Sequence, residues 1–340
     1  MLYVGLDLHY KRSTFCVMGA DGNILMTREV RGRWPRVIEA LEKLRAERND
    51  KLSVVFEASS GSGHFHDQVK KVAARVTVAH PGKLRLIFQS KRKNDRVDAQ
   101  KLAFLLYIGQ VPAVYVPDSG VRAWRKIIEY RSGLVAKRTR VKNQIRDFLK
   151  AAGKTPPRGL WTKHGVEWMK AQEFEHDLEQ VNFEIMIEEL LEFEGKLRRV
   201  ERKLSHEARK RPGVQLLMSI PGVGIRTAEA LVAYIDDPRR FAKNKQVPAY
   251  LGLVPRLDSS AGRDRLGHIT KEGPGTVRRL LTEAAWQAIR RSNKVEAYYK
   301  RVMHDDPGRK KIAIIAVAHY LARVSHAMLK NGEYWNEVTG

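Results

Sequence analysis

Residues 2–30, LYVGLDLHYKRSTFCVMGADGNILMTREV, decide the fold of the N-terminal part of the chain. Their apolar and β-branched residues fall into three short runs, at Leu2–Leu8, Thr14–Met18 and Ile24–Val30. Such runs predict strands, and the Asp21-Gly22 pair is typical of the tight turn that joins two of them. The stretch therefore predicts a meander of three neighbouring strands.

Strands and helices alternate after this meander. The spacing of apolar and β-branched residues predicts helices at Trp34–Glu47, His64–Ala74 and Asp95–Tyr107, and strands at Leu52–Glu57 and Arg75–Ala79. A meander followed by strand–helix alternation indicates an α/β domain with a mixed sheet, which we place at residues 1–115.

Four carboxylates of this domain stand out, two of them on apolar strands where an unpaired charge would be costly. Asp7 lies on one apolar strand and Glu57 ends another, while Asp95 and Asp98 begin a helix and share one of its faces. Four oxygen ligands could hold two Mg²⁺ ions, and such a pair clamps the attacking and leaving oxygens of a phosphoryl transfer. A turn, an arginine partner or a helix cap would explain each acid separately, so the combination is what favours a metal site.

The charge balance points to a polyanionic partner. The 340 residues include 63 Lys and Arg against 38 Asp and Glu, a net charge of +25, which favours nucleic acid over a merely cationic protein. Cys16 is the only cysteine, so an intrachain disulfide and a cysteine-based zinc site are excluded. We find no signal-peptide layout and no stretch typical of a membrane span, so we expect a soluble, cytoplasmic protein without a membrane partner.

The middle of the chain, residues 116–210, is predicted to be helical. Its first half is rich in cations, and we expect a phosphate-facing helix, although a solvated cationic face would show the same pattern. The candidate contacts are Arg122, Arg125, Lys126, Arg131, Lys137, Arg138, Arg140, Lys142 and Arg146. Apolar residues then recur through Glu173–Lys210 in an imperfect heptad, which predicts a coiled coil or a helical hairpin. This arm could join two subunits or pack against its own chain.

Residues 211–340 are predicted to form a mainly helical domain that begins with SIPGVGIRTA, residues 219–228. Pro221, Gly222 and Gly224 suit a tight turn between two helices, the second of which begins near Thr227. This pattern is typical of a helix–hairpin–helix, whose turn aims backbone N–H groups at a phosphate. An ordinary turn between helices is the alternative.

A polar segment of the same domain carries a pair of serines. Ser259 and Ser260 follow an apolar run and are expected in a loop, surrounded by Arg256, Arg263, Arg265, His268 and Lys271. A serine becomes a nucleophile when its proton is removed, and cations around it would hold a scissile phosphate. Serines are common in turns, so the pair alone does not indicate catalysis.

Taken in order, GLDLH, FEAS, KNDRVDAQKLA, SIPGVGIRTA and GLVPRLDSSAGRDRLGHITKEG resemble the DEDD transposases of bacterial insertion sequences, a family related to Piv-type DNA invertases. The resemblance implies an N-terminal domain with a RuvC-like, RNase H-like fold whose acidic ligands match Asp7, Glu57, Asp95 and Asp98. It also implies a C-terminal transposase domain with a catalytic serine. The fifth residue after the proline of the PR motif is Ser260, and Ser259 is the alternative.

The resemblance further implies partners and a division of labour. Members of the family work with a structured non-coding RNA, the bridge RNA, that pairs with donor and target DNA. The acids and the serine are far apart in sequence, so we expect domains to close on each other in a dimer or tetramer. Two alternatives stay open: a structure-specific nuclease or junction resolvase that uses water as nucleophile, and a non-enzymatic nucleic-acid-binding protein.

Overall fold

The computed structural model describes residues 1–87, 94–260 and 263–337, without the side chains of residues 258–260 and 263–266. Contacts divide the chain into two compact units, Met1–Arg122 and Ala123–Gly340. The second unit contains both the segment predicted as a middle domain and the one predicted as a C-terminal domain. The three-domain division itself stays a prediction.

The first unit is built on one mixed sheet. Its strands are β1 (Leu2–Asp7), β2 (Arg12–Met18), β3 (Ile24–Arg31), β4 (Leu52–Glu57), β5 (Arg75–Ala79) and β6 (Ala113–Val114). They are ordered β3-β2-β1-β4-β5-β6, with β4 parallel to β1 and β5, and the other pairs antiparallel. The predicted meander and the predicted mixed α/β architecture are confirmed.

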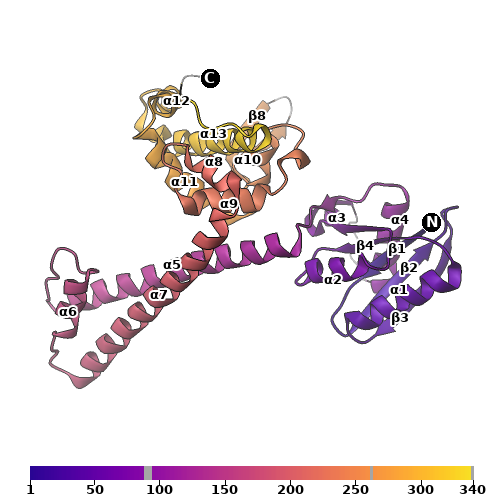
Figure 1. Cartoon of the computed structure of the whole chain (residues 1–340), viewed down its shortest axis with the longest axis horizontal. Helices are drawn as coiled ribbons and strands as arrows, with labels where there is room; N and C mark the ends of the chain where they lie inside the picture. Colours follow the sequence, from indigo (N-terminus) through magenta and orange to yellow (C-terminus); the bar gives the residue numbers. More distant parts are fainter. Residues whose placement is uncertain (88–93, 261–262, 338–340) are drawn as a thin grey trace. The chain divides into compact units, whose positions relative to one another are not determined.

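Helices cover both faces of this sheet (Figure 1). On one face α1 (Trp34–Arg48) and α2 (Ser62–Val69) pack on a core that contains Val4, Phe56 and Phe65. On the other face α3 (Pro81–Ile87) and α4 (Asp95–Tyr107) pack on smaller apolar clusters. The sequence did not predict α3, a short helix that begins at a proline.

Helix α4 crosses β1 at backbone contact distance. A Cβ atom on Gly5 would lie 2.2 Å from the carbonyl oxygen of Ala99 and 2.3 Å from the amide nitrogen of Ala103. Only a glycine fits in that space, and the small side chains of the buried alanines on α4 let the helix come this close to the strand. The contact fixes how α4 lies on the sheet, and with it the position of the acids at the start of α4.

Two long helices begin the second unit. The helix α5 (Ser119–Ala151) starts just before the unit boundary, and α7 (Asp177–Arg209) follows the short helix α6 (Lys163–Lys170). The C-terminal end of α5 and the N-terminal end of α7 share an apolar cluster with α6 that includes Ile145, Met169 and Phe183. The helices therefore pack against each other within one chain along part of their length.

The remaining helices form a globular core. They are α8 (Pro212–Met218), α9 (Ile225–Ile235), α10 (Gln246–Tyr250), α11 (Gly275–Ile289), α12 (Asn293–Met303) and α13 (Lys310–Asn331), with single 3₁₀ turns at Pro238–Arg240 and Pro307–Arg309. Their buried residues form one cluster with parts of α5 and α7.

One helical segment, Pro307–Asn331, is long and apolar enough to cross a membrane. The sequence-based expectation that no stretch would pass this test was therefore wrong. Half of the apolar window is buried inside the protein, and α13 packs against α11 and α12 through residues such as Val317 and Leu321. Its apolar character is explained by its place at the centre of the helical core.

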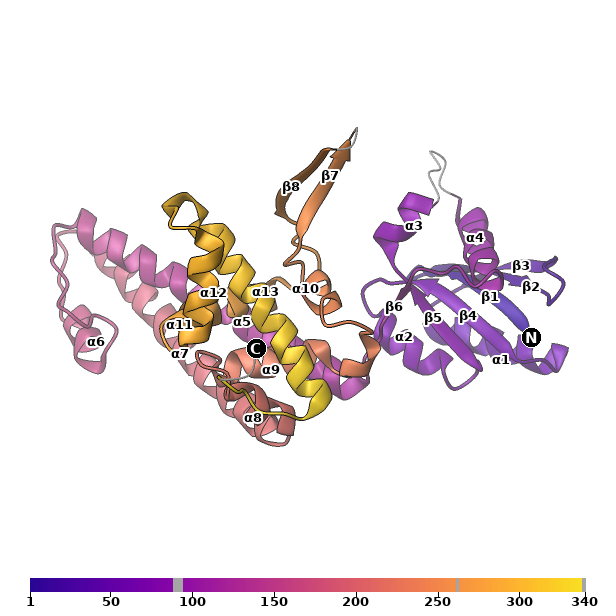
Figure 2. The same cartoon turned by 90° about the horizontal axis from the view of Figure 1, so that it is seen from above.

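The serine segment forms a β-hairpin, where the sequence predicted a loop. Strands β7 (Pro255–Ser260) and β8 (Arg263–Ile269) pair antiparallel and stand away from the helices of their unit (Figure 2). Few apolar residues alternate in this stretch, because the hairpin is not laid on a core, so the pattern of a half-buried strand is missing. At its base, Arg278 donates hydrogen bonds to the carbonyl oxygens of Leu251 (3.0 Å) and Glu272 (2.6 Å), which ties the two ends of the hairpin together.

A buried ion pair lies where α9 meets α7. Glu229 is 1% exposed, and Arg226 donates to its two carboxylate oxygens at 2.9 and 3.1 Å. Burial raises the pKa of the Glu229 carboxyl to about 7, and Arg226 opposes part of that rise. The group is thus held close to its titration point near neutral pH.

The contact at Gly5 predicts the effect of adding one methyl group. Gly5→Ala should lower the free energy of unfolding by about 2–3 kcal/mol, because the new Cβ must push α4 away from β1. Gly133→Ala in the middle of α5, where a Cβ meets open space, should raise it by about 0.5–1 kcal/mol. Urea unfolding of both variants tests this, and equal effects would show that α4 does not depend on the contact.

The raised pKa of Glu229 predicts a pH dependence of stability. The folded protein holds the proton more tightly than the unfolded chain, so this stability is complete below about pH 4.5 and is lost as pH rises through about 7, some 3 kcal/mol in all. Glu229→Gln is neutral throughout, so its free energy of unfolding should exceed that of the wild type at about pH 8 and match it near pH 4.5. Glu283→Gln, at an exposed ion pair, is the control; an unchanged pH profile in Glu229→Gln would refute the assignment.

Candidate active site

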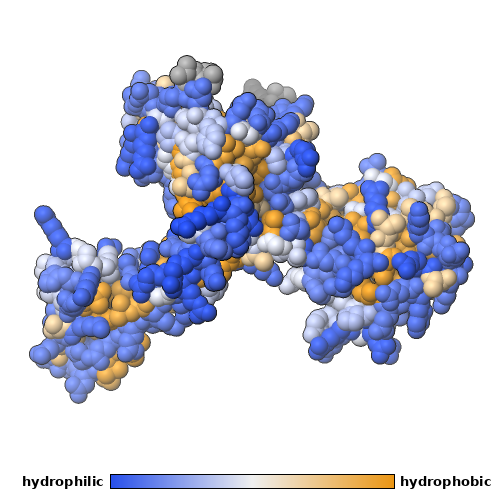
Figure 3. Space-filling model, viewed as in Figure 1, coloured by the Kyte–Doolittle hydropathy of each residue, from blue (hydrophilic) through white to orange (hydrophobic). Residues whose placement is uncertain are grey.

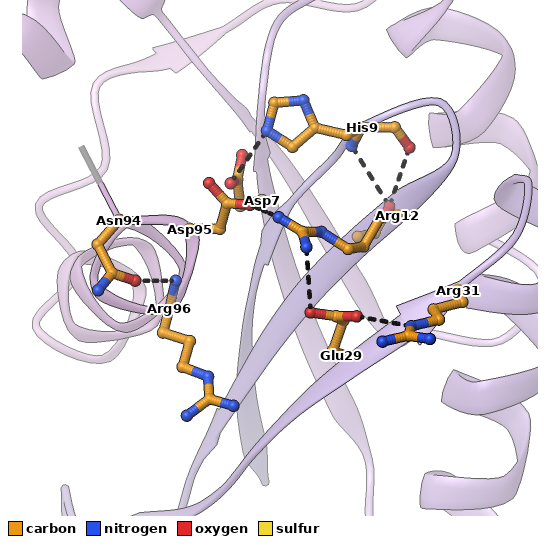
Figure 4. Close-up of polar contacts among 9 residues, drawn as sticks. Asp7, His9, Arg12, Glu29, Arg31, Asn94, Asp95 and Arg96 are labelled. Carbon is orange, nitrogen blue, oxygen red and sulfur yellow. Dashed lines mark hydrogen bonds and ion pairs between the residues drawn. The ribbon is translucent and has the colours of Figure 1, made fainter.

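Asp7, His9 and Asp95 form a compact cluster at the end of β1 (Figure 4). One ligand atom from each of the three lies within 4.8 Å of the others, and the Nε2 of His9 lies 3.3 Å from Oδ2 of Asp7. Asp7 is 19% exposed and Asp95 is 29% exposed. Two carboxylates this close and this accessible fit a divalent cation, which supplies the positive charge that would hold them together.

Local structure explains why these side chains meet. Asp7 is the last residue of β1, and His9 follows in the turn that leads to β2. Asp95 is the first residue of α4, whose start is fixed because the Asn94 side chain accepts a hydrogen bond from the Arg96 amide at 3.0 Å. The sheet supplies one carboxylate and the helix that crosses it supplies the other.

Glu57 and Asp98 lie outside this compact group. Leu6 pairs with Phe56, so Asp7 and Glu57 follow at the same edge of neighbouring parallel strands, where Glu57 is exposed. Asp98 lies one turn after Asp95 on α4, and its carboxylate is 3.9 Å from the Lys101 ammonium. The structure therefore brings two of the four predicted acids together, and it leaves Glu57 at the end of the neighbouring strand and Asp98 one turn further along α4.

Arginine balances the charge of the cluster. Arg12 of β2 lies 3.1 Å from Asp95 and 3.7 Å from Glu29 of β3, and its side chain is 56% exposed. An open pocket of about 370 Å³ beside the cluster is lined by His9, Lys11, Arg12 and Asp95. Carboxylates and cations thus share one accessible hollow, which suits a phosphodiester that needs both metal ligands and anion contacts.

Sequence reasoning missed His9, Lys11 and Arg12. The signal was present, because His9 stands two residues after Asp7 and two residues of an extended chain point to the same side. The cations follow directly in HYKR, residues 9–12. Their proximity to Asp95 depends on how α4 lies on the sheet, which a local sequence pattern does not predict.

Several cations of the basic helix are occupied within the chain. Arg122 is hydrogen-bonded to Asp67, which lowers the pKa of that carboxyl, and Arg131 lies 2.6 Å from Glu201. Arg125 donates to the Ala233 carbonyl oxygen at 2.7 Å, and Lys142 lies 3.4 Å from Glu194. Arg138 is half-buried, whereas Lys126, Lys137, Arg140 and Arg146 are exposed. These four are the members of the predicted set most available to a phosphate.

The predicted hairpin turn connects α8 to α9, but its residues differ in accessibility. A Cβ on Gly222, which has φ +86°, would lie 2.5 Å from the Ala288 amide nitrogen, so this glycine serves the packing of α11. Thr227 is 7% exposed and Pro221 is half-buried. Gly224 is exposed, and a Cβ there would meet nothing within 4 Å. Among the four residues of the predicted turn, Gly224 is the one whose backbone a phosphate could approach most closely.

The predicted serine site is described in part. Arg256 and Lys271 are exposed near the base of the hairpin. Ser259 and Ser260 belong to β7, and Arg263 and Arg265 to β8. The side chains of these four residues lie outside the part that the structure describes.

Comparison with known families agrees with this arrangement. Residues 4–153 match the model of a DEDD transposase family, described as "Transposase", and residues 214–300 match that of the "Transposase IS116/IS110/IS902 family". Together the two matches span well over half of the chain, and the first contains all four predicted acids. The chain belongs to the DEDD transposases of insertion sequences.

Individual relatives match along most of their length. The transposase of insertion sequence element IS1111A from Coxiella burnetii is 26% identical over 97% of this chain and 90% of its own. The transposase of element IS1328 from Yersinia enterocolitica is 24% identical over 84% of this chain and 85% of its own. The y4pF/y4sB protein of Sinorhizobium fredii, named a transposase by inference, is 26% identical over 86% of this chain and 77% of its own.

Family membership connects the fold and the chemistry. A transposase of this family is an enzyme that cleaves and rejoins DNA, which leaves the non-enzymatic alternative without support. The family implies an RNase H-like fold and the use of a divalent metal ion. The mixed sheet of the first unit and its carboxylate cluster fit both.

Removing one carboxylate of the cluster tests the metal site. Asp7→Asn keeps the size of the side chain and removes its charge, so Mg²⁺-dependent DNA cleavage should fall about a hundredfold or more. Affinity for duplex DNA should be unchanged or higher, because a charge that repels phosphate is gone. Asp21→Asn, an exposed turn residue of the same unit, is the control. Equal cleavage by the two variants would remove Asp7 from the site.

Proposed function

We propose that this transposase uses a serine on β7 as nucleophile, together with two divalent ions, Mg²⁺ by preference, held by Asp7, Glu57, Asp95 and Asp98. Ser260 is the preferred nucleophile and Ser259 the alternative. We further propose that a structured bridge RNA selects the donor and target DNA. The observation that supports the proposal best is the convergence of Asp7 and Asp95 from two different elements on one accessible hollow.

The carboxylates have a defined task in this proposal. Ions bound there would stabilise the negative charge that develops on a phosphate during transfer. Asp7 and Asp95 would hold one ion directly, while Glu57 on the neighbouring strand end and Asp98 on the next turn of α4 would complete the set. His9 would orient the Asp7 carboxylate through their 3.3 Å contact.

The serine step conserves the energy of the phosphodiester. The hydroxyl of Ser260 would lose its proton to a base as its oxygen bonds to phosphorus, and the bond from phosphorus to one sugar oxygen would break. The released sugar oxygen takes up a proton. A sugar hydroxyl of another strand would then attack the phosphoserine, which frees the serine and joins the new strands. Arg256, Lys271, Arg263 and Arg265 would hold the phosphate through both steps.

Charge supports nucleic-acid partners beyond the reacting strand. The net charge of +25 is consistent with binding RNA and DNA together, and exposed cations along α5 are Lys126, Lys137, Arg140 and Arg146. These residues are proposed to contact DNA or the bridge RNA. A helix–hairpin–helix role for the turn before α9 is part of the same proposal, with the exposed Gly224 as its point of approach.

An apolar row at the start of α7 supports a dimer or tetramer. Leu178 is 84% exposed, and Val181 and Ile185 are each 53% exposed. Spacings of three and four residues align the three side chains on one face of the helix. An exposed apolar row of this kind suits a coiled-coil contact with a second copy. Synapsis of two DNA segments needs at least two protomers.

We also propose that the protein works in the cytoplasm.

A covalent intermediate distinguishes this mechanism from its rival. Wild-type protein incubated with Mg²⁺, the RNA of its element and labelled donor DNA should yield a DNA-linked protein band on a denaturing gel. Ser260→Ala should lose the band, because the proposal assigns the attacking hydroxyl to this residue, and mass analysis of the wild-type adduct should place the phosphate on Ser260.

Ser259→Ala is the matched control and should keep the adduct. If Ser259→Ala loses the band and Ser260→Ala keeps it, the nucleophile is the neighbouring serine. Mg²⁺-dependent cleavage without any adduct in the wild type would refute a serine mechanism. It would favour a structure-specific nuclease or junction resolvase that uses water.

A further inference from the structure

A row of arginines on α7 lines a wide groove beside the start of α9. Arg198, Arg202 and Arg209 recur on one side of the helix and are all exposed. The groove has a volume of about 1290 Å³, and its other lining residues are Gly195, Glu201, Ser205, His206, Ile225 and Arg226. In Figure 3, strongly hydrophilic residues cover α7 where it approaches α9. The imperfect heptad of α7 by itself indicates only an architectural role for this helix.

The three arginines of the groove have no acidic partner among the described residues. Within the described part of the chain, Arg198, Arg202 and Arg209 form no ion pair. By contrast, Lys196 pairs with Glu192 at 2.5 Å and Lys210 with Glu207 at 2.8 Å. Three unneutralised cations along one groove raise the local positive potential, and an anionic partner would lower its energy.

The floor of the groove is fixed by a network that ties α9 to α7. Arg226 of α9 donates to Glu229 on its own helix and to the Ser205 hydroxyl on α7. Glu201 is the one acid among the described lining residues, and Arg131 of α5 lies 2.6 Å from it. That partner offsets the charge of Glu201, so the free charge of the groove stays positive and its walls stay in place.

The start of α9 adds donors to the same groove. Its N-cap residue, Gly224, offers no side chain to cap the first turn. The backbone N–H groups of a first helical turn carry partial positive charge and accept an anion when no side chain caps them. Ile225 and Arg226, the first residues of α9, line the groove, so these donors adjoin the arginine row.

We propose that this groove binds the sugar-phosphate backbone of duplex DNA. A rise of 1.5 Å per residue separates Arg198 from Arg202 by about 6 Å and Arg202 from Arg209 by about 10 Å along α7. Flexible guanidinium groups at such intervals can reach successive phosphates without reading bases. DNA is chosen over RNA because DNA is the substrate that the family acts on. The groove would position DNA, and it requires neither the serine nor the metal ions of the proposed mechanism.

A pair of matched double variants tests the proposal. R198Q/R202Q removes two charges from the groove, and R199Q/K203Q removes two exposed charges one position further round the same helix, outside the groove. Full-length proteins are titrated with a duplex of about 30 base pairs by fluorescence anisotropy, without divalent ions, between about 50 and 200 mM KCl. Thermal unfolding of both variants verifies that they fold alike.

R198Q/R202Q should bind about tenfold or more weakly at about 100 mM KCl, and its salt slope should be smaller by about two. R199Q/K203Q should bind within about twofold of the wild type. Equal losses in both variants would overturn the proposal, because the effect would then come from the general charge of α7. An unchanged affinity in R198Q/R202Q would overturn it as well. A loss seen only with an RNA hairpin of similar length would overturn the assignment to DNA.

Discussion

The close approach of α4 to β1 at Gly5 is the constraint on which the candidate active site depends. A helix that crosses a strand at backbone contact distance has little freedom to slide or tilt, since any side chain at the crossing would separate the two. The first residue of that helix is Asp95, and the last residue of that strand is Asp7. Packing in the apolar interior therefore sets the separation of two charged groups at the surface. A rigid scaffold of this kind suits catalysis, because ligands placed by the fold need no reorganisation when the substrate arrives.

The second unit follows a different principle. Its helical core is held by apolar packing, but two arginines with several hydrogen bonds each fix the position of the surface elements that carry the proposed sites. Arg278 ties together the base of the β7–β8 hairpin, and Arg226 ties the start of α9 to α7. Each guanidinium makes several hydrogen bonds in a fixed planar geometry, which suits a joint between elements better than a lysine would. The hairpin with the serines and the groove with the arginines are thus both anchored by arginine within the same unit.

Local patterns were sufficient for most of the fold and for part of the site. Most strands and helices of the first unit were predictable because the central strands β1, β2 and β4 are buried, so their apolar runs are clear. The hairpin β7–β8 was not, because strands that lie on no core lack an alternating pattern. Asp7 and Asp95 were predictable as candidate ligands from their places on a buried strand and at a helix start. The proximity of His9 and Arg12 to Asp95 was not predictable, because Asp95 lies more than eighty residues away in sequence. The groove of the α7 arginines was not predictable either, because it depends on how α9 packs against α7.

The ion pair between Arg12 and Asp95 gives the cluster a counter-ion of its own. A metal ion that binds Asp95 competes with this guanidinium, so the affinity measured for the metal includes the cost of displacing it. Because Arg12 is more than half exposed, that cost is small and salt lowers it further. The displaced guanidinium remains tethered beside the ion, where it can meet the next anion that enters. In the proposed mechanism, loading of the metal and capture of a phosphate would therefore be thermodynamically linked, and the arginine would act as the exchangeable charge between them.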